Sequence, residues 1–338
     1  FLSGDSGKTI TTKGNNEMDM PFSVERYLQG QSGADVVTTI DVTVQQALEN
    51  QMQLAVDRYD IQNGAFGIVM DVDTGEILAM GDKFYSELSP VTDEFWKFMR
   101  EHEMMDVESK PGKAGGGYCT RIANMRSPFI FANFNGTSHD VEVVTHEAGH
   151  AFACWMNRDR IPMDYMWPSM EACEVHSMSM EFFAWPWAEG FFGEDARKFR
   201  YNHLKGALAF IPYGTMVDHF QHIIYEYPEF SPQERHQVWQ ELLGIYMPWL
   251  RPGEIPFYGE GKGWQRQSHI YSSPFYYIDY CLAQTVALDF WARIQEDPKA
   301  AFKTYMDYTS LGGTMFFTDL LQAAGLGNPF DAETLKKV

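Results

Sequence analysis

Apolar positions recur every three or four residues through most of the chain beyond residue 137, the pattern of helices with one buried face. The first clear helix is predicted over residues 138–156. Its apolar positions are Val141, Val144, Ala148, Ala151 and Trp155. Thr137 followed three residues later by Asp140 has the form of a capping box, which marks where this helix begins.

The same spacing predicts further helices downstream, and prolines divide them. Helices are expected over residues 201–210, 217–227, 232–246, 275–295, 298–308 and 314–324. Proline has no amide hydrogen and disrupts the interior of a helix. We therefore expect a break at Pro212, Pro228 and Pro248. The long helix over residues 275–295 is expected to be buried.

The first 80 residues follow a different pattern. Residues 34–41 alternate apolar and polar positions, as a half-buried strand does, and residues 42–59 have the spacing of an amphipathic helix. Residues 64–72 and 73–80 are predicted as two antiparallel strands joined by a turn centred on Asp73-Thr74-Gly75. This strand, helix and hairpin would form a small α+β segment.

Composition indicates an acidic globular protein. The chain has 338 residues, of which 45% are hydrophobic and 15% aromatic, enough to bury sizeable cores in two or three modest domains. Its formal net charge of −20 argues against nucleic acid as a partner. No apolar run reaches the ~18 residues that would span a membrane. We expect neither a nucleic-acid nor a membrane partner.

The four cysteines are widely spaced and form no Cys-x-x-Cys pair; they are Cys119, Cys154, Cys173 and Cys281. This pattern predicts neither a disulfide framework nor a cysteine zinc site. Reduced thiols are typical of the cytoplasm, and we expect a cytoplasmic location.

The strongest chemical signal is the run His146-Glu147-Ala148-Gly149-His150. Residues i and i+4 of a helix share one face, so His146 and His150 can reach the same metal ion. Glu147 points about 100° away and can reach a water molecule without binding the metal. Two imidazoles with a carboxylate between them are parts that a zinc hydrolase needs. Glycine is unfavourable inside a helix, so Gly149 indicates that another backbone or a substrate comes close.

A zinc site needs at least three protein ligands. Glu171, Glu174 and Glu181 are spaced by three and seven residues, so they share one helical face. Their neighbours are apolar, and a carboxylate in such surroundings is unfavourable unless it is paired or bound to a metal. We interpret Glu174 as the third ligand, with Glu171 or Glu181 as alternatives. His219 and His222 would also suit a metal, but we prefer a structural or channel-lining role for them.

Four motifs, in this order, resemble the zinc peptidases of family M3, in particular their oligoendopeptidase F branch. They are the glycine run 115–117, the strand 127–137, the His-Glu-x-x-His run with Glu174 24 residues after His150, and the segment 269–280. The resemblance implies a mainly α, zincin-like helical metallopeptidase domain over residues 83–338. It also implies that residues 127–137 form a small β edge element ahead of the zinc helix.

Site roles follow from this resemblance residue by residue. It implies one zinc ion per chain, bound by His146, His150 and Glu174, with Glu147 as the general base. Glu181 is expected to accept a hydrogen bond from one of the two histidines and so to orient it.

The resemblance also implies residues that contact the substrate. His269, Tyr277 and Tyr280 would stabilise the oxyanion of the tetrahedral intermediate, and Tyr276 is a possible substitute for Tyr277. Read without the family, these tyrosines could be core aromatics with solvated hydroxyls. Further substrate contacts are implied at Ala132, Asn133, Gly136 and Tyr276.

Residues 1–82 are similar to a fragment of a class B penicillin-binding protein, the start of its transpeptidase domain. The catalytic motifs of that family, Ser-x-x-Lys, Ser-x-Asn and Lys-Thr/Ser-Gly, are absent from the sequence. We therefore expect a boundary between residues 82 and 83, with an N-terminal segment that packs loosely against the rest.

The function predicted from the sequence is hydrolysis of short, unstructured peptides by a zinc endopeptidase. The long N-terminal helical region of family M3 is not recognised in the chain. The alternative is therefore a catalytically silent hybrid of two partial proteins, whose only activity is binding. The sequence gives no indication of an oligomeric state.

Overall fold

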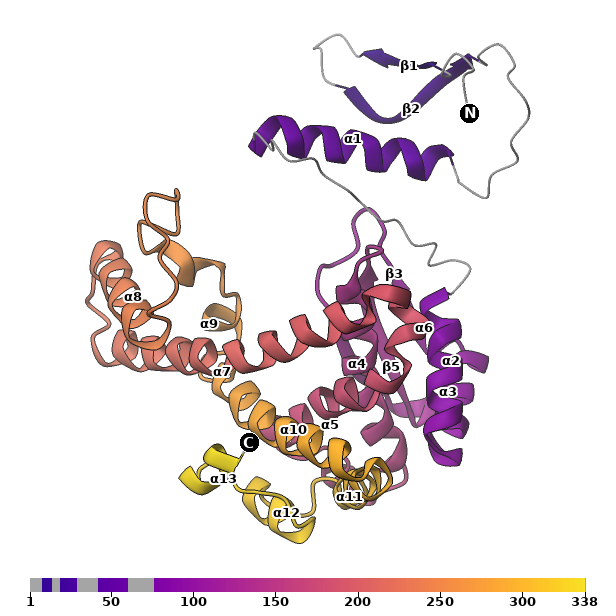
Figure 1. Cartoon of the computed structure of the whole chain (residues 1–338), viewed down its shortest axis with the longest axis vertical. Helices are drawn as coiled ribbons and strands as arrows, with labels where there is room; N and C mark the ends of the chain where they lie inside the picture. The colour runs from indigo at the N-terminus through magenta and orange to yellow at the C-terminus, as the bar shows by residue number, and fades with distance from the viewer. Residues whose placement is uncertain (1–7, 14–18, 29–41, 60–75, 338) are drawn as a thin grey trace. The chain divides into compact units, whose positions relative to one another are not determined.

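The computed structural model describes residues 8–13, 19–28, 42–59 and 76–337, and the chain divides into two units after Val69. In the first unit, strands β1 (Lys8–Lys13) and β2 (Asp19–Leu28) form an antiparallel pair. The helix α1 (Val42–Tyr59) has the predicted bounds (Figure 1). The strands predicted over residues 34–41 and 64–72 lie outside the described residues.

The second unit opens with two helices, α2 (Glu76–Leu88) and α3 (Pro90–Glu101). Residues 76–80 were predicted as a hairpin strand and are helical, so that prediction is wrong. The buried positions of α2 are Ile77, Leu78, Gly81, Phe84 and Tyr85. This helical period becomes visible only when the apolar run is followed past Met80. The helix α2 also runs across the boundary expected between residues 82 and 83.

A three-stranded sheet precedes the first long helix. The strands β3 (Met105–Glu108), β4 (Tyr118–Ile122) and β5 (Ser127–Phe134) are ordered β3-β5-β4. β3 is parallel and β4 antiparallel to β5. The strand expected at the sheet edge is therefore its middle strand. The reason is that short segments on both sides pair with β5, and β3 has too few residues to show a clear strand pattern.

The helices α4 (Ser138–Met156) and α5 (Met170–Phe183) pack directly on each other. A Cβ atom at Gly149 would lie 2.5 Å from the carbonyl oxygen of His176 and 2.6 Å from the Cα atom of Ser177. Distances this short between such atoms do not occur in proteins. The close approach of another backbone at Gly149 is thus confirmed, and it comes from α5.

The remaining helices complete a mainly α unit, as predicted. They are α6 (Ala188–Phe192), α7 (Ala196–Glu226), α8 (Pro232–Tyr246), α9 (His269–Ser272), α10 (Tyr277–Glu296), α11 (Pro298–Leu311), α12 (Phe317–Ala323) and α13 (Ala332–Lys337). Figure 1 shows α7 as one long helix, with α8 and α9 near one of its ends.

The break predicted at Pro212 is wrong, because α7 continues through it. A proline inside a helix removes one backbone hydrogen bond and weakens the helix by ~3 kcal/mol. Packing of α7 against α8 and α10 compensates for that loss. The other two prolines do lie beyond helix ends, since α7 ends at Glu226 and α8 at Tyr246.

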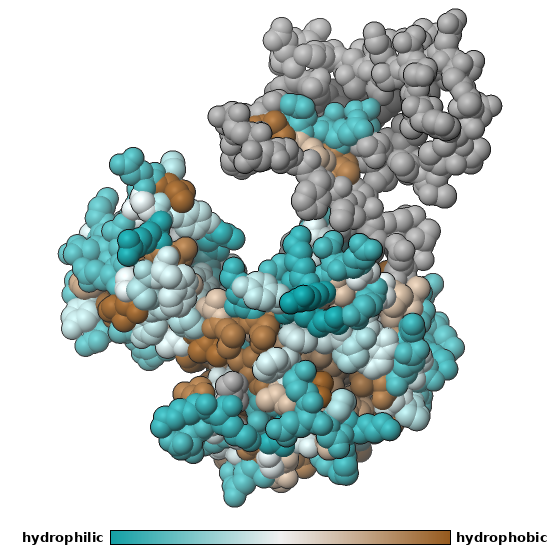
Figure 2. Space-filling view, viewed as in Figure 1, coloured by the Kyte–Doolittle hydropathy of each residue, from teal (hydrophilic) through white to brown (hydrophobic). Residues whose placement is uncertain are grey.

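Two apolar cores hold this unit together. The larger core contains residues from α2 to α5, α10 and α11, and the smaller one joins α7 to α8 through Phe220 and Trp239. The visible surface is mostly hydrophilic, with apolar residues gathered near its centre (Figure 2). Among the described residues, no helix is both long and apolar enough to cross a membrane. All four cysteines are free thiols in this structure.

Candidate metal centre

The helix α4 begins at a well-defined cap. The carboxylate of Asp140 accepts hydrogen bonds from the backbone amides of Asn135, Gly136 and Thr137, at 2.9, 2.6 and 3.1 Å. The bond from Thr137 satisfies the amide of the N-cap residue, and the other two bonds hold the turn before the helix. The predicted helix 138–156 is confirmed at both ends. The cap fixes the position from which the two histidines project.

His146, His150 and Glu174 converge. The Nε2 atoms of His146 and His150 each lie 3.3 Å from Oε2 of Glu174. Two ligands bonded at about 2.1 Å to a tetrahedral zinc ion are about 3.4 Å apart, so these separations fit such an ion. In the described part of the chain, these three residues form the one group with metal-site geometry.

The alternative ligand candidates take other places. Glu171 is outside this group, and Glu181 contacts the far side of His146. On α7, Nδ1 of His219 is 3.0 Å from the Tyr246 hydroxyl, and His222 lies beside Asp218. The pair on α7 therefore serves local contacts.

Glu174 is buried and held in its charged form. Burial alone would raise its pKa, but the imidazoles of His150 and His146 outweigh burial and hold the pKa well below its usual range. The hydroxyl of Ser177 donates to Oε2 at 3.0 Å, and the hydroxyl of Tyr276 donates to Oε1. An ionised carboxylate next to two imidazoles is a suitable donor set for a divalent cation.

Glu147 is buried beside this group and is 7% exposed. Burial raises its pKa, although the neighbouring imidazoles of His146 and His150 oppose the shift. Its Oε2 atom has no hydrogen-bond partner among the described residues. An unpaired carboxylate oxygen in a buried place is unusual. It is the kind of group that can accept a proton from a bound water.

These residues line a cavity of about 320 Å³. One wall comes from the segment 117–119, which contains the start of β4, and another from Trp167, Pro168 and Met170 at the start of α5. Two tyrosines of the predicted substrate segment, Tyr276 and Tyr280, also line it. The cavity therefore brings together the candidate metal ligands, a carboxylate and phenolic hydroxyls.

A family model for peptidase family M3 matches residues 37–338. The chain belongs to peptidase family M3. Oligopeptidase PepF of Bacillus subtilis (strain 168) is 25% identical over 255 residues, which are 72% of this chain and 37% of that protein. The oligoendopeptidase F homolog of Borreliella burgdorferi is 24% identical over 263 residues, 72% of this chain and 42% of its own length.

Solved structures agree with this membership. An X-ray structure described as an oligoendopeptidase F has 45% sequence identity and a TM-score of 0.77, and the match covers 88% of this chain and 54% of that one. PZ peptidase A, solved with an inhibitor, has 43% identity and the same TM-score, covering 89% of this chain and 57% of its own. The chain therefore spans about half the length of these structures and less than half of the curated relatives.

The family match begins at residue 37, inside the segment that was compared with penicillin-binding proteins. Neither these comparisons nor the described part of the structure show a penicillin-binding-protein fragment. The M3 part of the sequence prediction is confirmed.

Glu181 contacts Nδ1 of His146, the ring nitrogen that faces away from Glu174. His146 is one of the two histidines that Glu181 was expected to orient. Nδ1 of His146 is 2.7 Å from Oε1 of Glu181, and Oε2 of Glu181 is 2.6 Å from Nε2 of His203. His203 was missed by the sequence analysis. It lies on α7, 22 residues beyond Glu181, and no local pattern marks it as part of this site.

The aromatic segment is only partly oriented toward the cavity. Tyr276 and Tyr280 line it, whereas the ring of Tyr277 lies 5.6 Å from that of Phe210 and 6.1 Å from that of Tyr213. Tyr277 is not among the residues that line the cavity. Burial, and then the nearby charge of Glu174, raises the pKa of the Tyr280 hydroxyl, so it remains a proton donor at neutral pH.

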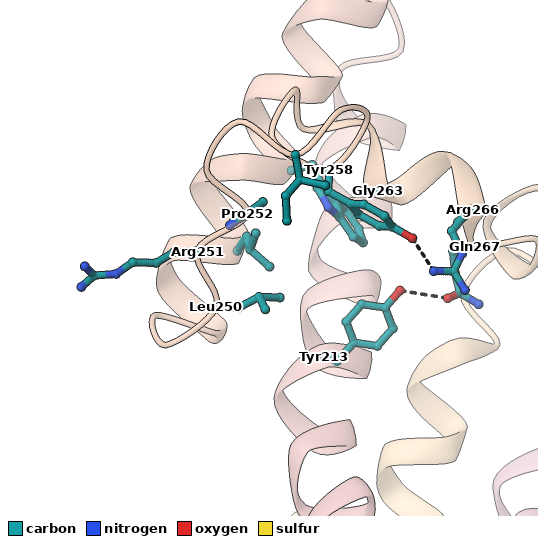
Figure 3. Close-up of a pocket in the computed structure, with 11 residues that line it drawn as sticks. Tyr213, Leu250, Arg251, Pro252, Tyr258, Gly263, Arg266 and Gln267 are labelled. Atoms are coloured by element: carbon teal, nitrogen blue, oxygen red, sulfur yellow. Dashed lines mark hydrogen bonds between the residues drawn. The ribbon is translucent and has the colours of Figure 1, made fainter. Parts of the chain in front are cut away.

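His269 contacts these tyrosines, but it is not among the residues that line this cavity or a second, larger one. Its ring lies 5.8 Å from that of Tyr280, and its Nδ1 atom is 2.8 Å from Nε2 of Gln267. Oε1 of Gln267 in turn accepts a hydrogen bond from Tyr213 at 3.0 Å, on the wall of a cavity of about 610 Å³ (Figure 3). Gln267 was also missed, because its role depends on contacts with α7.

Three residues implied as substrate contacts lie in the supporting structure beside the cavity and do not line it. Ala132 is fully buried, and its carbonyl oxygen accepts a hydrogen bond from Nζ of Lys113 at 2.6 Å. The side-chain amide of Asn133 donates to the carbonyl oxygens of Ala114 and Gly116, both at 2.9 Å. The backbone amide of Gly136 donates to the carboxylate of Asp140 in the helix cap. These contacts hold the backbone around the glycine run 115–117 and at the start of α4.

Proposed function

We propose that this chain is a zinc-dependent oligopeptidase, which cleaves internal bonds of short, unstructured peptides. The observation that carries the proposal is the convergence of Nε2 of His146, Nε2 of His150 and Oε2 of Glu174 beside the unpaired carboxylate of Glu147. The donor set and the 3.3 Å separations fit one zinc ion per chain.

When bound, the zinc ion supplies a Lewis acid that polarises the scissile carbonyl and makes water more acidic. Glu147 accepts the proton of the attacking water through its unpaired Oε2 and then returns it to the leaving amine. The raised pKa of this buried carboxyl favours the first step, because it binds the proton more tightly than an exposed glutamate does. Tyr280 donates to the developing oxyanion, and His269 contacts the substrate from the same side.

Short peptides are the proposed substrates because the relatives are named as oligopeptidases. The cavity of about 320 Å³ holds only a few residues of a peptide at the metal centre. A folded protein segment would have to unfold to enter it. The free thiols are consistent with a reducing compartment, and we propose the cytoplasm.

Metal analysis together with peptide cleavage tests this proposal. The purified chain should contain one zinc ion and hydrolyse a short, internally quenched fluorogenic peptide. A chelator should remove both properties, and added zinc should restore them. Zinc binding without any turnover would favour the catalytically silent hybrid, and failure to bind zinc would contradict the proposal.

The tyrosines can be told apart by three single substitutions. Tyr280→Phe should lower kcat by ~10²–10³, because it removes a hydroxyl donor to the oxyanion. Tyr277→Phe should change kcat much less, since its ring packs between Phe210 and Tyr213. Tyr276→Phe should instead weaken zinc binding, because the Tyr276 hydroxyl donates to Glu174. Steady-state kinetics with the fluorogenic peptide measures the first two effects. A larger loss of kcat in Tyr277→Phe than in Tyr280→Phe would assign the donor to the oxyanion to Tyr277.

A further inference from the structure

Glu181 divides its two carboxylate oxygens between two histidines from different helices. Oε1 is 2.7 Å from Nδ1 of His146 on α4, and Oε2 is 2.6 Å from Nε2 of His203 on α7. The two histidines are 57 positions apart in the sequence and meet only through this carboxylate. An ionised carboxylate can only accept hydrogen bonds, so each histidine nitrogen facing it must carry a proton.

Trp185 decides which nitrogen of His203 is protonated. Its indole Nε1–H is 3.1 Å from Nδ1 of His203. An indole nitrogen can only donate, so Nδ1 of His203 must be the acceptor. The proton of the neutral ring is therefore on Nε2, where it is donated to Glu181. One tautomer of His203 satisfies both neighbours.

The same reasoning extends to His146. Since Glu181 accepts from Nδ1–H, Nε2 is the nitrogen of His146 that is left to bind a metal ion. That nitrogen lies 3.3 Å from Oε2 of Glu174, on the side where His150 also points. A histidine binds a metal ion through one ring nitrogen, and its orientation is usually set by a partner on the other ring nitrogen.

The surroundings of His203 hold this arrangement rigid. Its side chain is 9% exposed. Its ring stacks on Phe199 with an interplanar angle of 12° and meets Phe182 edge-on at 5.0 Å. The carboxylate of Glu181 is thus fixed between two donors.

We propose that Trp185 and His203 form a positioning pair for the metal centre. Trp185 sets the tautomer of His203, His203 fixes Glu181, and Glu181 holds His146 with its Nε2 atom toward Glu174 and His150. This inference rests on the proposed zinc site and extends it to η3 (Trp185–Trp187) and α7, two elements that contribute no ligand. Neither residue touches the cavity where the substrate would bind.

Two substitutions at His203 separate the hydrogen bond from ring packing. His203→Gln keeps an Nε2–H donor for Glu181, whereas His203→Phe keeps an aromatic ring among Phe182 and Phe199 but donates nothing. Zinc affinity is measured by competition with a chromophoric chelator on the full chain. His203→Phe should lower it by about 10- to 100-fold, and His203→Gln by no more than about threefold. His219→Phe, at another position of α7, is the matched control and should leave affinity unchanged.

Nuclear magnetic resonance provides a readout independent of turnover. In the zinc-loaded chain with ¹⁵N-labelled histidine, His203 should show a protonated Nε2 and an unprotonated Nδ1, and His146 a protonated Nδ1. In Trp185→Phe the Nδ1 signal of His203 should shift, because its donor is lost, while zinc affinity should fall less than in His203→Phe. Circular dichroism checks that each variant is folded.

The outcomes separate this inference from the proposed function. If the wild-type chain binds no zinc, the proposed function fails. If it binds zinc and a folded His203→Phe binds it equally well, the positioning role fails while the metal site stands. A loss in His203→Gln as large as in His203→Phe would assign the effect to the ring rather than to the hydrogen bond. A His203 tautomer protonated on Nδ1 would overturn the role of Trp185.

Discussion

Replacing Glu147 by glutamine should leave zinc bound and abolish turnover. The proposed ligand atoms belong to His146, His150 and Glu174, so the amide removes none of them. An amide cannot accept the proton of the attacking water, and loss of a general base lowers the rate by ~10²–10⁴. Glutamine has nearly the same shape as glutamate, so the buried position should remain filled. Metal analysis and kcat with the fluorogenic peptide measure the two properties separately.

A control substitution shows whether the loss of turnover is specific to Glu147. Glu142 lies on the same helix, one turn earlier, and pairs with His139 on the surface of α4. Glu142→Gln should keep both zinc and turnover. If Glu147→Gln retained more than half of the wild-type kcat, another group would have to accept the proton. Loss of zinc in that variant would show that Glu147 supports the metal site itself.

The substitution Gly149→Ala should damage the metal centre without touching a ligand. The added Cβ atom would lie 2.5 Å from the backbone of His176, and backbone cannot rotate away as a side chain can. The helices α4 and α5 must move apart, which should reduce the free energy of unfolding by about 1–3 kcal/mol. The same movement separates His150 from Glu174, so zinc affinity should fall as well. Thermal unfolding of the metal-free chain and chelator competition measure the two effects.

Gly206→Ala provides the matched control for this prediction. Gly206 lies inside α7, and a Cβ atom there would meet nothing within 4 Å. Alanine is favoured over glycine inside a helix by about 1 kcal/mol, so this variant should be unchanged or slightly more stable. If Gly149→Ala were equally stable and bound zinc normally, the close contact between α4 and α5 would not be needed for the site.

The parts of the candidate site that the sequence analysis located depend on local patterns. The cap at Asp140, the helix 138–156 and the spacing of His146 and His150 all lie within one short segment. The choice of Glu174 rested on its apolar neighbours, and it is 4% exposed. Chemistry that is encoded by spacing along one helix can be read from the sequence because helix geometry is fixed.

The parts that were missed depend on contacts between distant segments. His203, Trp185 and Gln267 enter the site through hydrogen bonds that cross from α7, η3 and the loop before α9. None has a spacing that distinguishes it from an ordinary helix or loop residue. Two local predictions also failed for physical reasons. A short apolar run at 76–80 fits a strand or a buried helix, and the proline in α7 is outweighed by packing.

The three converging atoms come from two different helices, and this has a thermodynamic consequence. In the unfolded chain the histidines and Glu174 are far apart on average, so an ion binds the folded state preferentially. Binding to the folded state alone adds about 2.7 kcal/mol of stability when the free ion is at 100 times its dissociation constant. The ion would then act as a reversible cross-link between α4 and α5, and the melting temperature of the second unit would report its concentration.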